Sequence, residues 1–430
     1  MFEFRLNILS SLFLRVAFAV ISLLTISFLS GVMQKTEFGE YNYYFSIYSL
    51  CLIPFTVGFS RFNVRFLASM EEGVRTLEAG VVFDAEIKII GVMLTVSLLV
   101  LLFLYSYSPF SPVIMFFLMT IPFVAIKNVI VSLYRGMGHT FYGNFDGLLL
   151  FPLLFIIVLY FSHKVLSVEL LAVYNAMVFL MISIGVALIF YVSKCFLFKL
   201  KGNTPVFRLN SKVLVSIALF TVIGALDVLN MHLDIAILGG MSTVSQVAEY
   251  KVSTTLKSVV LLPMQSFMLF IPFLFSKYCA DNSAKELQKN IYYLTFLNVL
   301  MVFVFLVLYL FWGEYFIRLL FSDEYLQVKY IAMILIASVF ISSLFGPAIE
   351  LLIASGYEKL VFRLVCGVML ITVIGNVIVA AAYGALGVAF VSGLSMCLLS
   401  MLGCYAAFIK TKLNTSIFWF IFIAYRRYMC

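Results

Sequence analysis

The sequence predicts an all-α integral membrane protein with about twelve transmembrane helices. Hydrophobic residues make up 64% of the 430 residues and charged residues only 11%. A soluble domain could not cover itself with so little polar surface. The apolar stretches are also long enough for spanning helices, unlike the ten-residue alternation of an outer-membrane barrel. Most of the chain is therefore expected to lie within a membrane.

Each expected span is close to the length of about 20 residues that a helix needs to cross a bilayer. The spans are residues 11–33, 40–60, 87–108, 112–134, 144–162, 170–194, 213–240, 247–275, 290–312, 330–352, 359–382 and 385–409. Apolar and charged residues mix between Arg61 and Lys88, which predicts a helix lying on the inner membrane surface, with a solvated charged loop as the alternative. The apolar stretch 417–424 is too short to span and is expected at the interface.

The net charge of +8 is explained by topology rather than by nucleic-acid binding. Most of the 28 Lys and Arg residues fall on one side of the expected spans. Only Lys35, Lys164, Arg318 and Lys329 fall on the other side. By the positive-inside rule, both termini are expected in the cytoplasm. The first apolar stretch lacks a cleavage pattern and is expected to be retained as a helix.

The residue inventory argues against a metal centre or a disulfide framework. The chain has three histidines and no CxxC or HExxH motif. Its seven cysteines mostly lie inside or at the ends of expected spans, where they suit packing. No cofactor is expected, although coupling to H⁺ or Na⁺ remains open.

The two halves of the chain repeat each other. At an offset of 209 residues, Gly31 aligns with Gly240, Glu40-Tyr41 with Glu249-Tyr250, and Pro54 with Pro263. Six spans per half give a parallel repeat, with a substrate path expected between the halves. The expected organisation is an N-terminal six-helix lobe at 1–200, a linker at 201–212, a C-terminal six-helix lobe at 213–410, and a cytoplasmic or interfacial tail at 411–430.

Two carboxylates lie inside the seventh span. Asp227, Asn230 and Asp234 share one helical face, with the carboxylates about 10 Å apart along the axis. Charge at bilayer depth is costly and usually faces a cavity or a partner. Asp227 and Asp234 are therefore candidates for ion coupling. The alternative is a structural role, through a pair with Lys257 or through hydrogen bonds to Asn230 and nearby hydroxyl groups.

Four cations also lie within the expected spans, namely Arg15, Lys127, Lys251 and Lys257. Cations in a low-dielectric cavity would hold an anionic substrate. The alternative is that each side chain snorkels or pairs with a carboxylate, and this is favoured for Lys251. Tyr48, in the aromatic-rich second span, is a further candidate for lining the cavity against a sugar ring. The other tyrosines there fit an interfacial belt.

Several motifs resemble the multidrug/oligosaccharidyl-lipid/polysaccharide (MOP) exporter superfamily, and within it the Wzx-like oligosaccharide flippases. They are Asp234 followed by Leu238-Gly239 in span seven, Tyr250 and Leu262-Pro263 in span eight, Phe38-Gly39-Glu40-Tyr41 at the start of span two, and Tyr383–Ala389 before span twelve. Many relatives have Gly before the span-eight Tyr, whereas this chain has Glu249. The resemblance covers the whole chain and implies a MATE-like fold.

The resemblance also implies a function. It implies a flippase in the bacterial inner membrane that moves undecaprenyl-diphosphate-linked oligosaccharide, such as an O-antigen unit, from the inner to the outer leaflet. Its partners would be this lipid-linked substrate, membrane lipids and other polysaccharide assembly proteins. The alternatives are a MATE-like drug or metabolite cation antiporter and, less favoured, a polysaccharide polymerase or ligase. No nucleophile–base constellation supports an enzyme.

Overall fold

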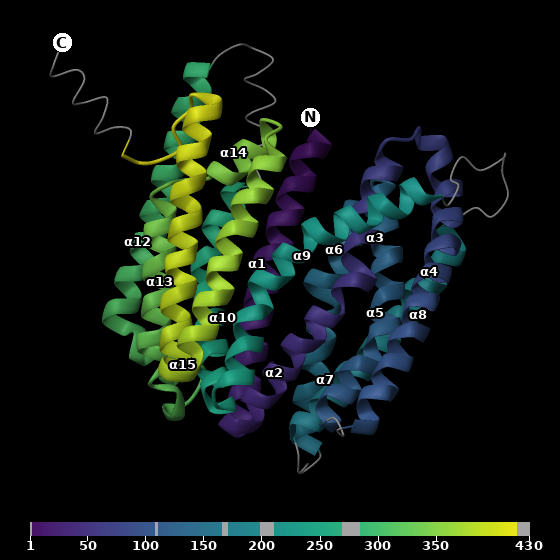
Figure 1. The fold of residues 1–430 in the computed structure, drawn as a ribbon, viewed down its shortest axis with the longest axis horizontal. Helices are drawn as coiled ribbons and strands as arrows, with labels where there is room; N and C mark the ends of the chain where they lie inside the picture. The colour runs from purple at the N-terminus through teal and green to yellow at the C-terminus, as the bar shows by residue number, and fades with distance from the viewer. Residues whose placement is uncertain (1, 108–110, 166–170, 198–209, 269–283, 419–430) are drawn as a thin grey trace. The chain divides into compact units, whose positions relative to one another are not determined.

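We describe a computed structural model, which covers residues 2–107, 111–165, 171–197, 210–268 and 284–418 (Figure 1). Every regular element in these ranges is helical. The chain divides into two compact units. Unit 1 comprises residues 1–25 and 40–236, and unit 2 comprises residues 26–39 and 237–430. The division separates two helical lobes, as expected, while the limits 1–200 and 213–410 stay a prediction.

Unit 1 is built mainly from helices of the first half of the chain. They are α1 (Phe2–Val32), α2 (Lys35–Cys51), α3 (Ile53–Ala68), α4 (Glu72–Tyr107), α5 (Pro112–Gly136), α6 (Thr140–Phe145), the π-helix η1 (Asp146–Leu150), α7 (Phe151–Val165), α8 (Leu171–Leu197) and most of α9 (Ser211–Met241). Helix α5 packs against both α3 and α8, so it forms the centre of the unit.

The expected second span is bent rather than straight. Helices α2 and α3 meet at Leu52 with a bend of 52°. Pro54 lies in the first turn of α3, where a residue without an N–H is tolerated. The bend redirects α3 toward α5 and α9 and continues the helix to Ala68, beyond the expected end at residue 60.

The expected surface helix between Arg61 and Lys88 is wrong. Helix α3 ends at Ala68 and α4 begins at Glu72, with only a short turn between them. Helix α4 then runs without interruption to Tyr107. Glu78 and Glu86, two charged residues of this stretch, are buried. Their burial shows that this part of α4 packs inside unit 1 instead of lying on a surface.

Unit 2 is built from α10 (Val244–Met268), α12 (Ala284–Leu320), the short 3₁₀ helix η2 (Asp323–Tyr325), α13 (Val328–Ser343), α14 (Ala348–Ala354) and α15 (Glu358–Thr411). Helix α13 packs against α10, α12 and α15. Helix α15 reverses at Gly384, whose φ of 54° and ψ of −139° are not helical. It therefore supplies two antiparallel spans, and the expected glycine turn before the last span is confirmed.

A segment from the start of the chain also belongs to unit 2. Residues 26–39 include the end of α1 and the first residues of α2. Gly39 lies so close to α10 that a Cβ atom there would overlap the backbone carbonyl of Val244. The expected Phe38-Gly39 motif therefore marks a helix contact that only glycine permits.

The residues that follow α15 form a strap along one end of unit 2. Gln288 on α12 exchanges two hydrogen bonds with the backbone of Asn414, at 2.6 and 2.9 Å. The Thr415 hydroxyl donates to the carbonyl of Phe345 at 2.6 Å, and the Ile417 N–H donates to the carbonyl of Leu344 at 2.9 Å. The strap thus satisfies carbonyls that the break between α13 and α14 leaves without a helical partner.

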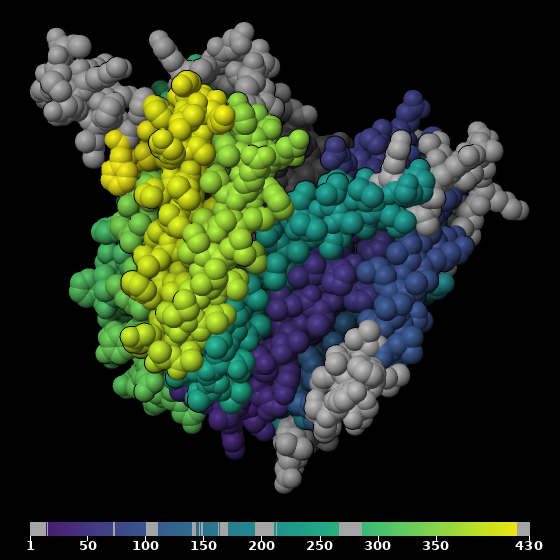
Figure 2. Space-filling model, viewed as in Figure 1, coloured from purple at the N-terminus to yellow at the C-terminus, as the bar shows by residue number. Residues whose placement is uncertain are grey.

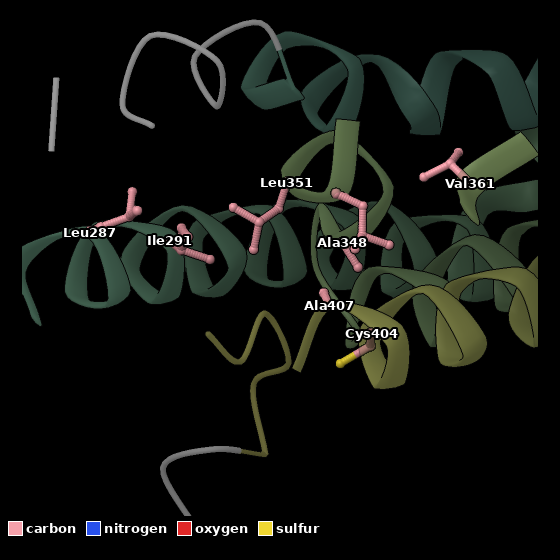
Figure 3. Close-up of a cluster of buried hydrophobic side chains, with 8 residues drawn as sticks. Leu287, Ile291, Ala348, Leu351, Val361, Cys404 and Ala407 are labelled. Carbon is pink, nitrogen blue, oxygen red and sulfur yellow. The ribbon is translucent and has the colours of Figure 1, made fainter. Parts of the chain in front are cut away.

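An apolar core lies beneath this strap. It combines side chains from α12, α14 and α15, seven of which are labelled in Figure 3: Leu287, Ile291, Ala348, Leu351, Val361, Cys404 and Ala407. Leu413, the first strap residue after Lys412, packs against the same cluster. The strap and the helices therefore share one core.

We expect Gly346→Ala to destabilise the protein more than Gly356→Ala. Both glycines have positive φ, at 67° and 81°, which costs an alanine about 1–2 kcal/mol. Only at Gly346 would the new methyl group also overlap the strap, at the carbonyl of Thr415, whereas Gly356 faces open space. Apparent melting temperatures of the two variants in detergent measure the difference. Equal losses would contradict a close fit between the strap and Gly346.

Five helices in the described ranges are long and apolar enough to cross a membrane, and seven spans result if each bent helix pair counts as one. The 54-residue α15 is among the five and provides two spans. The chain is therefore a multi-pass membrane protein, in agreement with about twelve expected spans.

Candidate functional site

Two helices of unit 1 cross at unusually close range. A Cβ atom at Gly58 on α3 would overlap Thr221 and the carbonyl of Ile217 on α9. One at Gly224 on α9 would overlap Val57 and lie 2.9 Å from Nε of Arg61. The two glycines allow α3 and α9 to approach, as small residues do at membrane helix interfaces.

This crossing places an arginine beside one of the expected carboxylates. Arg61, one turn after Gly58, makes an ion pair with Asp227 at 2.5 Å between Nη2 and Oδ2. Both side chains remain accessible, at 39% for Arg61 and 69% for Asp227. Asp227 lies midway between Val213 and Met241, the ends of the apolar stretch of α9. Charges at such a depth face a polar cavity or pathway rather than lipid.

The polar face of α9 follows the expected spacing. Asp227 and Asn230 are exposed, and Asp234 is half-buried. In Figure 2, α9 (teal) lies at the surface of the face in view. The expected alternative partner of Asp227 was Lys257, whereas the structure pairs it with Arg61. Sequence analysis had assigned Arg61 to the surface segment after the second span, because the extension of α3 beyond the bend left no signal in the apolar pattern.

Lys127 is a buried cation of unit 1. It lies on α5 with only 8% exposure, and its Nζ is 5.3 Å from the centre of the Phe151 ring. An ammonium group over an aromatic face gains a cation–π attraction that grows as water is removed. The structure therefore places Lys127 inside the helix packing, next to the start of α7.

Tyr48 packs inside an aromatic cluster. It stacks on Phe117 at 5.5 Å and meets Phe179 edge-on at 5.9 Å. Phe45 joins both rings and also contacts His232 on α9. Tyr48 itself is 2% exposed. This burial makes Tyr48 part of the core of unit 1, and its contact with a substrate stays a prediction.

The structure describes fewer side-chain contacts for the other three expected cations. Lys251 and Lys257 lie on α10 of unit 2, and both are half-buried. The backbone carbonyl of Lys251 accepts hydrogen bonds from Thr254 and Thr255 at 2.9 Å. Arg15 lies on α1, and its side chain is outside the described part of the chain. Their roles in binding stay predictions.

Unit 2 contains an ion pair that sequence analysis did not find. Lys35 and Glu249 approach to 2.6 Å, and Lys35 also reaches the carbonyl of Glu324 at 3.3 Å. Lys35 Nζ lies 5.7 Å from the ring centre of the buried Tyr325. Glu249 stands where the resemblance led us to expect glycine, and its partner comes from 214 residues earlier in the chain. The ion pair with Lys35 explains how a charged side chain is tolerated at position 249.

We expect Gly224→Ala to displace Arg61 and lower stability. The new methyl group would overlap Val57 and press on the Arg61 guanidinium, and overpacking of this kind costs about 1–3 kcal/mol. Gly31→Ala on α1 is the matched control, since nothing lies within 4 Å of its Cβ position. That control should gain up to about 1 kcal/mol in helix propensity. Melting temperatures that move in the same direction for both variants would contradict the close crossing.

Comparison with known structures identifies the fold. No family model and no curated protein sequence matches the chain. A lipid II flippase, MurJ, in an inward closed conformation matches with a TM-score of 0.70 and 13% identity over 93% of this chain and 87% of that one. An inward-facing multidrug resistance MATE family transporter matches with a TM-score of 0.66 and 12% identity over 91% and 98%.

A third structure belongs to a MOP superfamily transporter from Pyrococcus furiosus, described as having a binding pocket of reverse polarity. It matches with a TM-score of 0.64 and 13% identity over 94% of this chain and 95% of that one. All three matches extend over nearly the whole chain. The expected MATE-like architecture is therefore confirmed, and the protein has the fold of the MOP superfamily transporters.

Proposed function

We propose that this protein is a flippase that moves a polyprenyl-diphosphate-linked oligosaccharide across the bacterial cytoplasmic membrane by alternating access. The substrate would be an undecaprenyl-diphosphate-linked unit of O-antigen or a similar surface polysaccharide. The shared fold supports a transporter, and the solved structures that share it include a lipid II flippase.

The accessible Arg61–Asp227 pair is the observation that most favours an anionic substrate. A guanidinium group binds phosphate oxygens through two parallel hydrogen bonds, which a lysine cannot reproduce. With 39% of its side chain exposed, Arg61 can reach a ligand. A diphosphate would compete with Asp227 for Arg61, so that substrate binding exchanges one ion pair for another. Lys127, Lys251, Lys257 and Arg15 would contribute further positive charge.

Asp227 and Asp234 are the proposed ion-coupling residues. A carboxylate released from Arg61 by the diphosphate would be free to bind H⁺ or Na⁺. Asp227→Asn is expected to leave the fold intact and to remove the dependence of transport on the ion gradient. Unchanged gradient dependence in this variant would remove Asp227 from coupling.

A drug or metabolite cation antiporter is the second candidate. It is favoured by one observation, namely that Asp227 is more exposed than Arg61 and could itself face a cationic ligand. The overall fold does not discriminate between the two, because MATE transporters share it.

Reconstitution into liposomes separates the candidates. Vesicles would contain a labelled polyprenyl-diphosphate oligosaccharide, and an external reagent would report the label that reaches the outer leaflet. Faster access than in protein-free vesicles supports the flippase. No acceleration, together with uptake of a cationic dye against an imposed ion gradient, would favour the antiporter.

A further inference from the structure

A buried polar cluster in unit 1 lies apart from the Arg61–Asp227 pair. It joins Asn63 on α3, Glu86 on α4 and Ser132 on α5, all at most 1% exposed. The Asn63 amide donates to Oε2 of Glu86 and to Oγ of Ser132, both at 2.9 Å. The Ser132 hydroxyl donates to the carbonyl of Val129 at 2.7 Å. One side chain from each of three packed helices therefore meets at Asn63.

Two oxygen atoms of this cluster have no hydrogen-bond donor. Oε1 of Glu86 and Oδ1 of Asn63 are buried, and both are acceptors without a partner in the described structure. Unsatisfied buried acceptors cost free energy, and a buried carboxylate charge costs several kcal/mol more. The cluster therefore has neither a positive charge beside Glu86 nor a hydrogen-bond donor for these two oxygen atoms.

The cations of the neighbouring helices contact groups other than Glu86. On α3, Arg61 pairs with Asp227 and Arg65 lies over the ring of Phe220. On α5, Lys127 lies over Phe151 and Arg135 donates to the carbonyl of Gly143.

The remaining titratable groups nearby do not pair with Glu86 either. On α5, Tyr134 shares a hydrogen bond with Ser193. On α8, Tyr191 packs against Phe83 of α4. On α4 itself, Asp84 and Lys88 are exposed. No salt bridge to Glu86 is present within the described ranges.

One added proton would remove the buried charge and supply the missing donor. A carboxylic acid and a primary amide are complementary, because the amide N–H donates to one acid oxygen while the acid O–H donates to the amide oxygen. Asn63 already makes the first of these bonds. A proton on Oε1 would remove the buried charge and supply the donor that Oδ1 of Asn63 lacks.

We propose that Glu86 is a proton-binding site, that Asn63 holds it as the neutral acid, and that loss of this proton loosens the packing of α3, α4 and α5. The released proton passes to water and leaves a carboxylate between the three helices. Gly136 on α5 packs against Asn63, since a Cβ atom there would lie 2.8 Å from the Asn63 carbonyl. A charge at Glu86 therefore acts where α3 and α5 are in close contact. The proposal does not depend on the substrate carried.

The sign of the pH effect follows from proton counting. In the unfolded chain, a glutamate releases its proton above pH of about 4.3. The folded protein would still hold the proton there, so its stability should fall as pH rises. Loosening should also lower the hydrogen-exchange protection factors of amides in α3, α4 and α5 at high pH, after correction for the intrinsic rise of exchange with pH.

Glu86→Gln tests the site on the full-length protein in detergent, without a transport assay. Glutamine is neutral and can make the same two bonds with Asn63, so the variant should fold. We expect it to lose both the pH-dependent change in exchange and the infrared carbonyl band of a buried carboxylic acid. Glu78→Gln is the matched control, since Glu78 is equally buried on the same helix. It should keep both signals.

Three results would overturn the proposal. The first is a carboxylic-acid band that persists in Glu86→Gln. The second is the loss of that band in Glu78→Gln instead. The third is a wild-type stability that follows Na⁺ concentration at constant pH, because the two oxygen atoms would then hold a metal cation rather than a proton.

Discussion

Replacing Arg61 with alanine is expected to slow translocation of the lipid-linked oligosaccharide about 10- to 100-fold, because a hydrogen bond to a charged group contributes about 1.5–3 kcal/mol. Arg61 is an accessible cation at the α3–α9 crossing, and its ion pair with Asp227 would be exchanged for the diphosphate. Arg61→Lys should retain part of the activity, since it keeps the charge but loses the planar fork. The leaflet-accessibility assay in liposomes measures both rates.

Arg318→Ala is the matched control for this prediction. Arg318 also pairs with an aspartate, Asp323, at 3.5 Å, and both side chains are well exposed. Exposed pairs of this kind contribute about 0–1 kcal/mol, so transport and stability should change little. Equal losses of transport in Arg61→Ala and Arg318→Ala would contradict a substrate contact at Arg61.

Replacing Lys35 with methionine is expected to produce the largest loss of stability, about 3–5 kcal/mol. The reason is that Glu249, whose side chain is 9% exposed, would keep a buried charge without its partner. Tyr325 cannot replace the positive charge of the ammonium group, because its phenol is neutral. Its hydroxyl is buried without a hydrogen-bond partner, and burial, together with Glu324 and Glu249, raises the pKa of its phenol. Thermal unfolding in detergent measures the effect.

Two further variants separate a buried pair from an exposed one. Lys329→Met breaks the pair with Glu314, which has a similar distance of 2.7 Å but more exposed side chains. That change should cost about 0–1 kcal/mol. Combining Lys35→Met with Glu249→Leu should recover most of the lost stability, because no charge remains buried. A double variant as unstable as Lys35→Met alone would argue against this explanation.

The sequence predicted the elements that depend on local pattern. Apolar length predicted most helices, and the Gly384 turn between the last two spans followed from its glycine-rich motif. The spacing of Asp227 and Asn230 predicted a shared polar face, and both side chains are exposed on α9. These features depend on helix period and on backbone freedom, which nearby residues determine.

Features that depend on distant partners could not be predicted in this way. Arg61 and Asp227 are 166 residues apart, and the strap residue Asn414 is 126 residues from Gln288. Glu86 falls in the stretch that was expected on the membrane surface, because periodicity does not reveal that α3 and α5 cover it. In each case a polar side chain that its own helix cannot satisfy finds its partner on a distant segment of the chain.

The central claim is that the diphosphate charge of a lipid-linked sugar is what this protein recognises. The most direct measurement compares three lipids with the same oligosaccharide in the liposome assay, linked through a diphosphate, a monophosphate or no phosphate. We expect the fastest translocation for the diphosphate, a slower rate for the monophosphate, and the background rate for the neutral lipid. Equal rates for all three lipids, or rates unaffected by Arg61→Ala, would contradict the claim.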